Sequence, residues 1–413
     1  MSHLPDFRKP QKYTIVFFRW CLLSVIMGTV GGLLGALFHH ALHFVTHIRS
    51  EHMWLIYLLP FGGLLTVAIY RHPKMRNNKG TNEMIEATLD GHPVSPLVAP
   101  SIFLATAITH LFGGSGGREG AALQLGGSSA SFLANLFHLK ESNRKILVTA
   151  GMSSVFAGLF GTPLTAALFC MEFSSVGTFF SPALLPCFLS SFVASQLSHS
   201  LGVHAETYIL TQSFTLTLGN SWRYLILCIL VSLLGILMCT VFHKAEHLAA
   251  HHLPNPFIRI FVGGMLITVM TLLVGDHRFN GAGMEMALNA VGGSTDWYSF
   301  LLKMLFTAVT LAAGFKGGEI VPTFCIGATF ACFFGGLLGL DAGMAAAMGL
   351  IGLFCCATNS PLASIMLSVE MFGGTNIHLF AFISVICFVL SGKYGLYSSQ
   401  ILQFNKEDAL GNN

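Results

Sequence analysis

Residues 113–127 read GGSGGREGAALQLGG, and this glycine-rich stretch lies between two long apolar segments. The run AALQL after Glu119 and Gly120 favours a helix, so Glu119 stands at a helix N-terminus. The exposed N–H groups and the positive end of the dipole attract anions at such a position. A carboxylate can occupy the position itself and vacate it on protonation or displacement. The sequence therefore predicts that Glu119 is a gate at an anion site.

The composition predicts an all-α polytopic membrane protein. Of 413 residues, 53% are hydrophobic and only 9% are charged, and the mean hydropathy is +0.69. A soluble domain carries about 25% charged residues. Several apolar segments are long enough, or nearly so, to cross a bilayer core of about 30 Å. They are residues 20–45, 53–70, 97–112, 222–243, 257–274 and 374–391. An unpaired glutamate at membrane depth is costly, which strengthens the functional interpretation of Glu119.

The distribution of basic residues predicts the orientation. Basic residues cluster at 8–12, 71–79 and 140–145, and such loops face the cytoplasm. Residues 1–13 are polar, so we expect no cleavable signal peptide. The cysteines show no CxxC spacing and no HExxH motif occurs. We therefore expect a multi-pass protein of the cell membrane, surrounded by lipid bilayer, with no metal, cofactor, nucleic-acid partner or soluble domain.

The chain contains an internal repeat. GTPLTAALFCMEF at 161–173 matches NSPLASIMLSVEMF at 359–372, and each has a glutamate nine places after its proline. Two further pairs occur in the same order. They are GREGAALQLG at 117–126 with GEIVPTFCIG at 318–327, and NEMIEATLDG at 82–91 with MEMALNAVGG at 284–293. The three separations are 198, 201 and 202 residues, so the matches share nearly one offset.

Repeats with glycine-interrupted segments are typical of secondary transporters, in which broken helices aim their N-termini at a shared midplane site. We interpret residues 1–205 as an N-terminal transmembrane half and residues 206–413 as a C-terminal half, an inverted repeat of the first. The most polar mid-chain connection, residues 202–220, contains the expected join.

The motifs resemble those of the CLC family of chloride channels and proton-coupled anion (chloride/fluoride) transporters. GREG at 117–120 is similar to the family's GREGP, with Ala121 in place of the proline. GFKGGEIVPTF at 314–324 is similar to the family's third element, G-x-x-G-G-x-F-x-P. Tyr397 in YGLYSSQIL matches the tyrosine of the family's last helix. KGTNEMIEA at 79–87 stands in the place of the family's first element, GSGIPEIE, but fits it poorly.

This resemblance implies a CLC-type inverted-repeat helical bundle, with broken helices meeting at a central anion site. It also implies a homodimer in which each subunit has its own path for chloride or fluoride, with protons as a second transported ion. Glu119 would be the external gating glutamate, and Tyr397 would donate its hydroxyl to the anion. The anion-binding residues implied by the resemblance are Tyr397, Thr81, Asn82, Gly117, Arg118, Gly120, Ile320 and Val321.

Several residues have a second interpretation. Glu119 could form a structural ion pair with Arg118 or a distant basic residue, and Tyr394 competes with Tyr397. Lys316 could pair with Glu319 or add positive potential beside the anion path. Glu172 and Glu370 each close a repeated helix, and the safer interpretation of both is a structural one, such as capping a neighbouring helix N-terminus.

Three departures from the family pattern leave the ion and the coupling open. Phe173 stands where proton-coupled chloride members have a second glutamate, so protons leave by another route or coupling is weak or absent. Thr81 or Asn82 must replace the serine of the first element. The GGE version of the third element resembles the fluoride-exporting branch, which carries a threonine where Val321 stands.

Anion transport with chloride as the default ion is the function that the sequence favours, and fluoride export by proton antiport is the alternative. An intramembrane enzyme is a remote alternative, because no Ser–His, Asp–Asp or HExxH arrangement occurs in the repeated core. A transporter for organic anions would need arginine clamps, and the core segments offer only Arg118.

Overall fold

The structure is a computed structural model that describes residues 8–75, 78–205, 207–208, 210 and 212–403. Parts of the 71–79 loop and of the 202–220 join, and the residues beyond 403, lie outside this range. The first half contains α1 (Arg8–Glu51), η1 (Met53–Leu58), α2 (Leu59–Tyr70), η2 (Pro73–Met75), α3 (Thr81–Asp90), α4 (Val98–Leu111), α5 (Glu119–Leu136), α6 (Glu141–Phe160), α7 (Pro163–Glu172), β1 (Ser175–Val176), η3 (Ser181–Ala183) and α8 (Leu184–Ser200).

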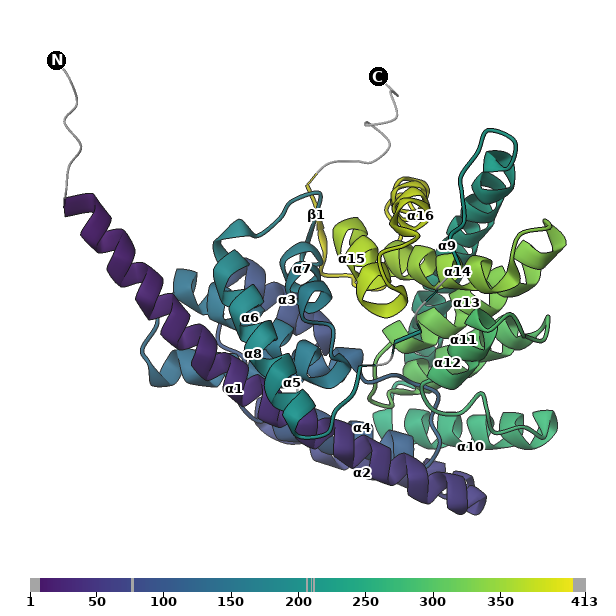
Figure 1. The fold of residues 1–413 in the computed structure, drawn as a ribbon. Coiled ribbons are helices and arrows are strands. Elements are labelled where there is room, and N and C mark those ends of the chain that lie inside the picture. The colour runs from purple at the N-terminus through teal and green to yellow at the C-terminus, as the bar shows by residue number, and fades with distance from the viewer. Residues whose placement is uncertain (1–7, 76–77, 206, 209, 211, 404–413) are drawn as a thin grey trace.

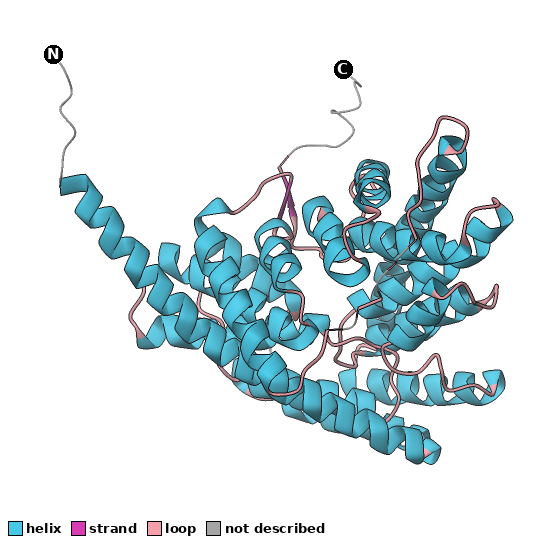
Figure 2. Cartoon of the chain, viewed as in Figure 1, coloured by secondary structure: helices cyan, strands magenta, loops and turns pink. Residues whose placement is uncertain are grey.

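The rest of the described chain contains a second set of eight α-helices and the second strand. It contains α9 (Ser221–His252), α10 (Pro256–Val274), α11 (Met284–Val291), α12 (Ser299–Ala313), α13 (Ile320–Leu337), α14 (Ala342–Thr358), α15 (Pro361–Phe372), α16 (Ile377–Leu390) and β2 (Ile401–Leu402). Figure 1 shows the two groups of helices side by side. Figure 2 shows that the described chain is mostly helical, with loops between the helices and one small strand pair in which β1 runs parallel to β2.

The bundle contains both long and short helices, from 44 residues in α1 to 8 in α11. Five segments of the described chain are long and apolar enough to cross a membrane: Tyr13–Glu51, Met53–Tyr70, Ser221–His252, Pro256–Val274 and Ile320–Leu337. The expected spans 97–112 and 374–391 fold as α4 and α16, which have 14 residues each. A helix of that length rises only about 21 Å, so it does not cross a bilayer core unaided. The all-α polytopic fold with interrupted helices is thus confirmed.

Helix packing follows the sequence repeat. The helix α5 packs against α4 and α6 as α13 packs against α12 and α14, and α1 contacts α6 and α8 as α9 contacts α14 and α16. Three equivalent pairs also meet across the halves: α2 with α10, α5 with α13, and α7 with α15. Equivalent elements meet in this way at the pseudo-symmetry axis of a repeat. The division at residue 205 and the inverted relation of the halves stay predictions.

The closest helix crossings are repeated as well. A Cβ added to Gly126 of α5 would lie 2.2 Å from the Gly151 carbonyl oxygen of α6. The equivalent Cβ on Gly327 of α13 would lie 2.3 Å from the Gly349 oxygen of α14. Small residues let membrane helices approach closely, so each crossing depends on the absence of a side chain. These crossings hold α5 and α13, whose N-termini form the site described next.

Candidate anion site

The N-termini of α5 and α13 are joined directly. Gly117 and Gly318 form an isolated antiparallel bridge, in which Gly117 N–H donates to the Gly318 oxygen at 2.6 Å and Gly318 N–H donates back at 2.8 Å. A Cβ on Gly318 would lie 2.7 Å from the nitrogen of Glu119 and 2.8 Å from that of Gly120. Only glycine permits this approach. Two positive helix ends therefore meet at one place inside the bundle.

Glu119 is the first residue of α5 and is fully buried. Its Oε2 accepts a hydrogen bond from the Arg118 N–H at 3.1 Å, and the backbone N–H groups of Glu119 and Val321 also interact with the carboxylate. Its Oε1 has no partner among the described residues. The predicted position at a helix N-terminus is confirmed. The carboxylate lies where donors from both helices converge, and its gating role stays a prediction.

The other residues expected from the first and third elements lie nearby. Thr81 begins α3, and its hydroxyl would be 3.0 Å from a Cβ on Gly120. Ile320 and Val321 are the first two residues of α13 and are buried. The Asn82 side chain points elsewhere, because its Oδ1 accepts a hydrogen bond from Ser399 N–H at 3.0 Å. Thr81 rather than the Asn82 side chain is therefore placed beside α5.

Tyr397 is also at the site, and it is not among the residues that line the vestibule described below. It is buried, its ring packs edge-on against Phe173 with centroids 5.8 Å apart, and it interacts electrostatically with Glu119 and Glu319. Its hydroxyl lacks a partner within the part of the chain that the structure describes. Tyr394 is 41% exposed. The preference for Tyr397 as the anion ligand fits this placement and stays a prediction.

A second carboxylate stands at the site. Glu319 is the N-cap residue of α13, and its Oε2 would be 3.5 Å from a Cβ on Gly120. This oxygen is buried without a partner in the described chain, and the carboxyl group interacts electrostatically with that of Glu119. The Lys316 ammonium lies over the Tyr70 ring, 4.6 Å from its centroid, and also interacts with Glu319. The GGE motif was visible in the sequence, but the closeness of the two glutamates was not.

Glu172 and Glu370 cap each other's helices. The Glu172 carboxylate at the end of α7 accepts from the N–H groups of Leu362 at 3.1 Å and Ala363 at 2.9 Å, at the start of α15. The Glu370 carboxylate of α15 accepts from Leu164 at 2.9 Å and Thr165 at 2.8 Å, at the start of α7. The predicted structural capping role is confirmed for both residues.

A vestibule of about 1360 Å³ leads towards the site, and its walls include Arg49, His110, Arg118, Arg278 and Val321. The last turns of α1 line it, so it lies at the end of α1 remote from the basic residues at 8–12. The positive-inside bias places that end outside the cell. Acidic side chains line it as well, and Arg278 forms ion pairs with Asp276 and Asp296, each at 2.7 Å.

Lys303 of α12 binds the loop that contains Gly281, a residue that lines this vestibule. Its ammonium is fully buried and donates to Ser115 Oγ at 2.9 Å and to the carbonyl oxygens of Phe279 at 3.2 Å and Gly281 at 2.6 Å. These bonds tie the loop before α11 to the loop before α5. The sequence analysis missed Lys303, because it stands alone in an apolar helix and belongs to no motif.

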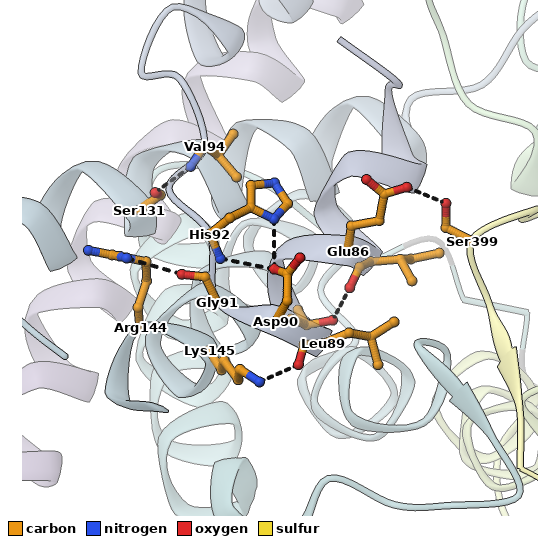
Figure 3. A network of polar contacts seen from close by, with 12 residues as sticks. Glu86, Leu89, Asp90, Gly91, His92, Val94, Ser131, Arg144, Lys145 and Ser399 are labelled. Carbon is orange, nitrogen blue, oxygen red and sulfur yellow. Dashed lines mark hydrogen bonds and ion pairs between the residues drawn. The ribbon is translucent and has the colours of Figure 1, made fainter. Parts of the chain in front are cut away.

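A polar network fixes the other end of α3 (Figure 3). Glu86 accepts from the Ser399 hydroxyl at 2.9 Å, Arg144 donates to the Gly91 oxygen at 3.0 Å, and Lys145 donates to the Leu89 oxygen. The residues 144–145 belong to a basic stretch that is expected to face the cytoplasm. The network therefore holds α3 with its N-terminus towards the anion site.

The protein is a membrane-embedded helical bundle in which two joined helix N-termini hold a carboxylate. This fold and this site place it in the class of anion channels and anion transporters. The family model described as voltage gated chloride channel matches residues 62–391, and the chain belongs to this family, the CLC family. Members are integral membrane proteins that move anions.

Individual relatives agree with this assignment. The chloride/fluoride channel protein of Pseudomonas syringae pv. tomato is 32% identical over 98% of this chain and 92% of its own length. The H(+)/Cl(-) exchange transporter ClcA of Vibrio campbellii is 24% identical over 97% of this chain and 92% of its own. The crystal structure of a CLC-type fluoride/proton antiporter superposes with a TM-score of 0.91 at 30% identity, covering 94% of this chain and 98% of that one.

Proposed function

We propose that this chain exchanges halide for protons across the membrane and that fluoride is the halide it exports. The observation that carries the proposal is the pair of buried carboxyl groups, Glu119 and Glu319, at the joined N-termini of α5 and α13. The sequence analysis favoured chloride. The proximity of the second carboxyl group, which only the packing of the two halves reveals, shifts the preference.

The gate works by competition for one set of donors. The ionised Glu119 carboxylate uses N–H groups that a halide would otherwise use. When it binds a proton, its attraction to the positive helix ends falls, and the halide takes its place. Each exchange of carboxylate for halide therefore requires a proton, which couples the two movements.

The chemistry around the gate suits fluoride. Fluoride is the most strongly hydrated halide and the strongest hydrogen-bond acceptor. A site that removes its water must therefore supply strong hydrogen-bond donors in place of that water. A protonated Glu119 or Glu319 would donate an O–H, and hydrogen bonds to an ionised partner are the short, strong kind. The Tyr397 hydroxyl, which has no partner within the described ranges, supplies another donor.

Chloride is the second candidate. Val321 lines the vestibule and is the second residue of α13, and its side chain adds no hydroxyl to the backbone N–H at this position. A larger and less hydrated ion needs fewer donors, which favours chloride here. The relative named as a chloride/fluoride channel protein leaves the same choice open.

Proton transfer on the cytoplasmic side must avoid the position of Phe173, which is fully buried and apolar. Tyr397 packs against Phe173 and interacts with both glutamates, so a route past its hydroxyl is part of the proposal. We also propose that the protein transports rather than catalyses and that it acts as a homodimer.

Efflux from liposomes loaded with either fluoride or chloride, with external pH recorded throughout, tests the proposal. Fluoride efflux with stoichiometric proton uptake is the expected result, with slower chloride efflux. Chloride efflux that exceeds fluoride efflux would move the preference to the second candidate. Halide efflux of either kind without proton movement would make the protein a channel.

A further inference from the structure

A second, much smaller cavity lies beside the gate. Its volume is about 20 Å³, and its walls are apolar side chains except for Glu119, Thr162 and Thr165. These three residues are 0%, 4% and 1% exposed. Oε1 of Glu119 and Oγ1 of Thr162 have no hydrogen-bond partner in the described chain, whereas the Thr165 hydroxyl also interacts with the Glu370 carboxylate.

The sequence explains why the Thr162 hydroxyl is unused. Thr162 is the N-cap residue of α7, and a threonine there normally accepts from the N–H groups of the first turn. In this protein the Glu370 carboxylate already takes the N–H groups of Leu164 and Thr165. The hydroxyl is thus displaced from its usual partner at a place where the cavity opens beside it.

The equivalent place in the second half lacks this arrangement. Ser360 corresponds to Thr162, and its hydroxyl donates to the Thr358 oxygen at 3.2 Å. Ala363 corresponds to Thr165 and has no hydroxyl. Ile320 stands opposite Glu119 in the repeat. The unpartnered oxygens therefore occur on the side of the repeat that carries the gate.

We propose that the cavity binds a single water molecule, which joins Oε1 of Glu119 to the hydroxyls of Thr162 and Thr165. A cavity needs about 10–15 Å³ to hold a water molecule, and a buried water makes about three hydrogen bonds. The cavity meets both conditions with three oxygens. Beside an ionised carboxylate a water molecule is preferred to an anion, because it donates a hydrogen bond and carries no charge.

This water makes Thr162 and Thr165 positioning residues for the gate. By donating to Oε1 it stabilises the ionised carboxylate in its buried position and supplies a partner through which a proton can reach it. The charged and titratable groups that also interact with Glu119 are Arg118, Lys303, Glu319 and Tyr397. These groups are unchanged by substitutions at the two threonines.

Thermal unfolding of the purified protein tests the site without reference to transport. The variant Thr162→Val keeps the side-chain shape and removes the hydroxyl that has no partner in the described chain. If the water is bound, the variant loses a hydrogen bond to it and the Tm falls by a few degrees. If the cavity is dry, the variant removes an unpaired hydroxyl and the Tm rises. A rise, or no change, overturns the proposal.

The pH profile of halide efflux tests the role of the water and rests on the proposed function. Without the water the ionised gate is less stable, so half-maximal flux should shift upward by about one pH unit, the scale of one hydrogen bond to a charged group. The matched variant Thr162→Ser keeps the hydroxyl and should keep the native midpoint. An unshifted midpoint in the valine variant removes the positioning role. A flat profile in the native protein would contradict the proposed function instead, and the Tm result would still decide the water site.

Discussion

The starts of α5 and α13 occupy equivalent places in the repeat and are joined by one bridge, yet they carry their glutamates differently. On α5 the carboxylate belongs to Glu119, the first helical residue, and it folds back onto backbone N–H groups. On α13 the carboxylate belongs to Glu319, one position before the helix, and its Oε2 is unpartnered in the described chain. The framework is symmetric and the chemistry is not.

This contrast separates structural from functional residues. The glycine crossings and the reciprocal caps of Glu172 and Glu370 occur in both halves, because each half needs them to fold. Glu119 and Thr165 are replaced in the second half by the apolar residues Ile320 and Ala363, and the hydroxyl of Ser360, which corresponds to Thr162, is hydrogen-bonded to the Thr358 oxygen. Features that break the repeat therefore point to transport, and those that keep it point to stability.

The largest expected effect comes from removing the charge of the α5 carboxylate. Glu119→Gln mimics the protonated gate, so halide efflux should continue while its pH dependence and the accompanying proton movement disappear. Paired recordings of halide and pH in liposomes measure both. Glu319→Gln is the matched variant on α13, and it should retain pH-dependent flux because the gate itself still titrates. Equal loss of pH dependence in both variants would break the distinction between the two helix starts.

The symmetric residues should respond in a symmetric way. Glu172→Gln and Glu370→Gln each replace a charged acceptor of two backbone N–H groups by an amide with one acceptor oxygen. Losing one hydrogen bond to a charged group costs about 1.5–3 kcal/mol, so both variants should lower thermal stability by similar amounts. Proton coupling, measured on the folded fraction, should be retained. Selective loss of coupling in Glu172→Gln alone would make that residue functional.

Much of the framework could be predicted from the sequence because its signals are local or periodic. Glycines before a helix-forming run placed Glu119, and proline followed nine residues later by glutamate exposed the repeat and the two caps. The lengths of the apolar segments gave the class of protein. Helices α4 and α16 are shorter than the apolar runs that contain them, because glycine-rich loops and turns lie at their ends.

The rest of the site depends on contacts between distant segments. Lys303 reaches Ser115 across 188 residues, and no motif surrounds it. The unused hydroxyl of Thr162 follows from a cap supplied by Glu370, which only the packed pair α7–α15 reveals. Glu319 was noticed as a motif residue, but its distance from Glu119 is set by the Gly117–Gly318 bridge.

A smaller effect, on the preference between fluoride and chloride, is expected from a substitution at the start of α13. Val321 provides a backbone N–H and an apolar side chain, whereas a threonine of the same shape adds a hydroxyl donor. Because a hydrogen bond to a charged partner is worth about 1.5–3 kcal/mol, Val321→Thr should raise the fluoride-to-chloride flux ratio by roughly tenfold. Efflux of each ion under one gradient measures the ratio. If the native protein already excludes chloride, or the ratio does not move, the side chain at 321 does not set the preference.

The smallest effect is expected from removing the Tyr397 hydroxyl, a neutral donor that interacts with the glutamates at both helix starts. Tyr397→Phe removes only a hydroxyl and keeps the packing of the ring against Phe173. A neutral hydrogen bond is worth about 0.5–1.5 kcal/mol, so halide affinity should fall by roughly three- to tenfold. Isothermal titration with fluoride and chloride measures the change. Tyr394→Phe is the control, because that ring is 41% exposed and its loss of a hydroxyl should leave affinity unchanged. The reverse ranking would place the anion next to Tyr394, in the segment after α16, and would remove Tyr397 from the donors that α5 and α13 share.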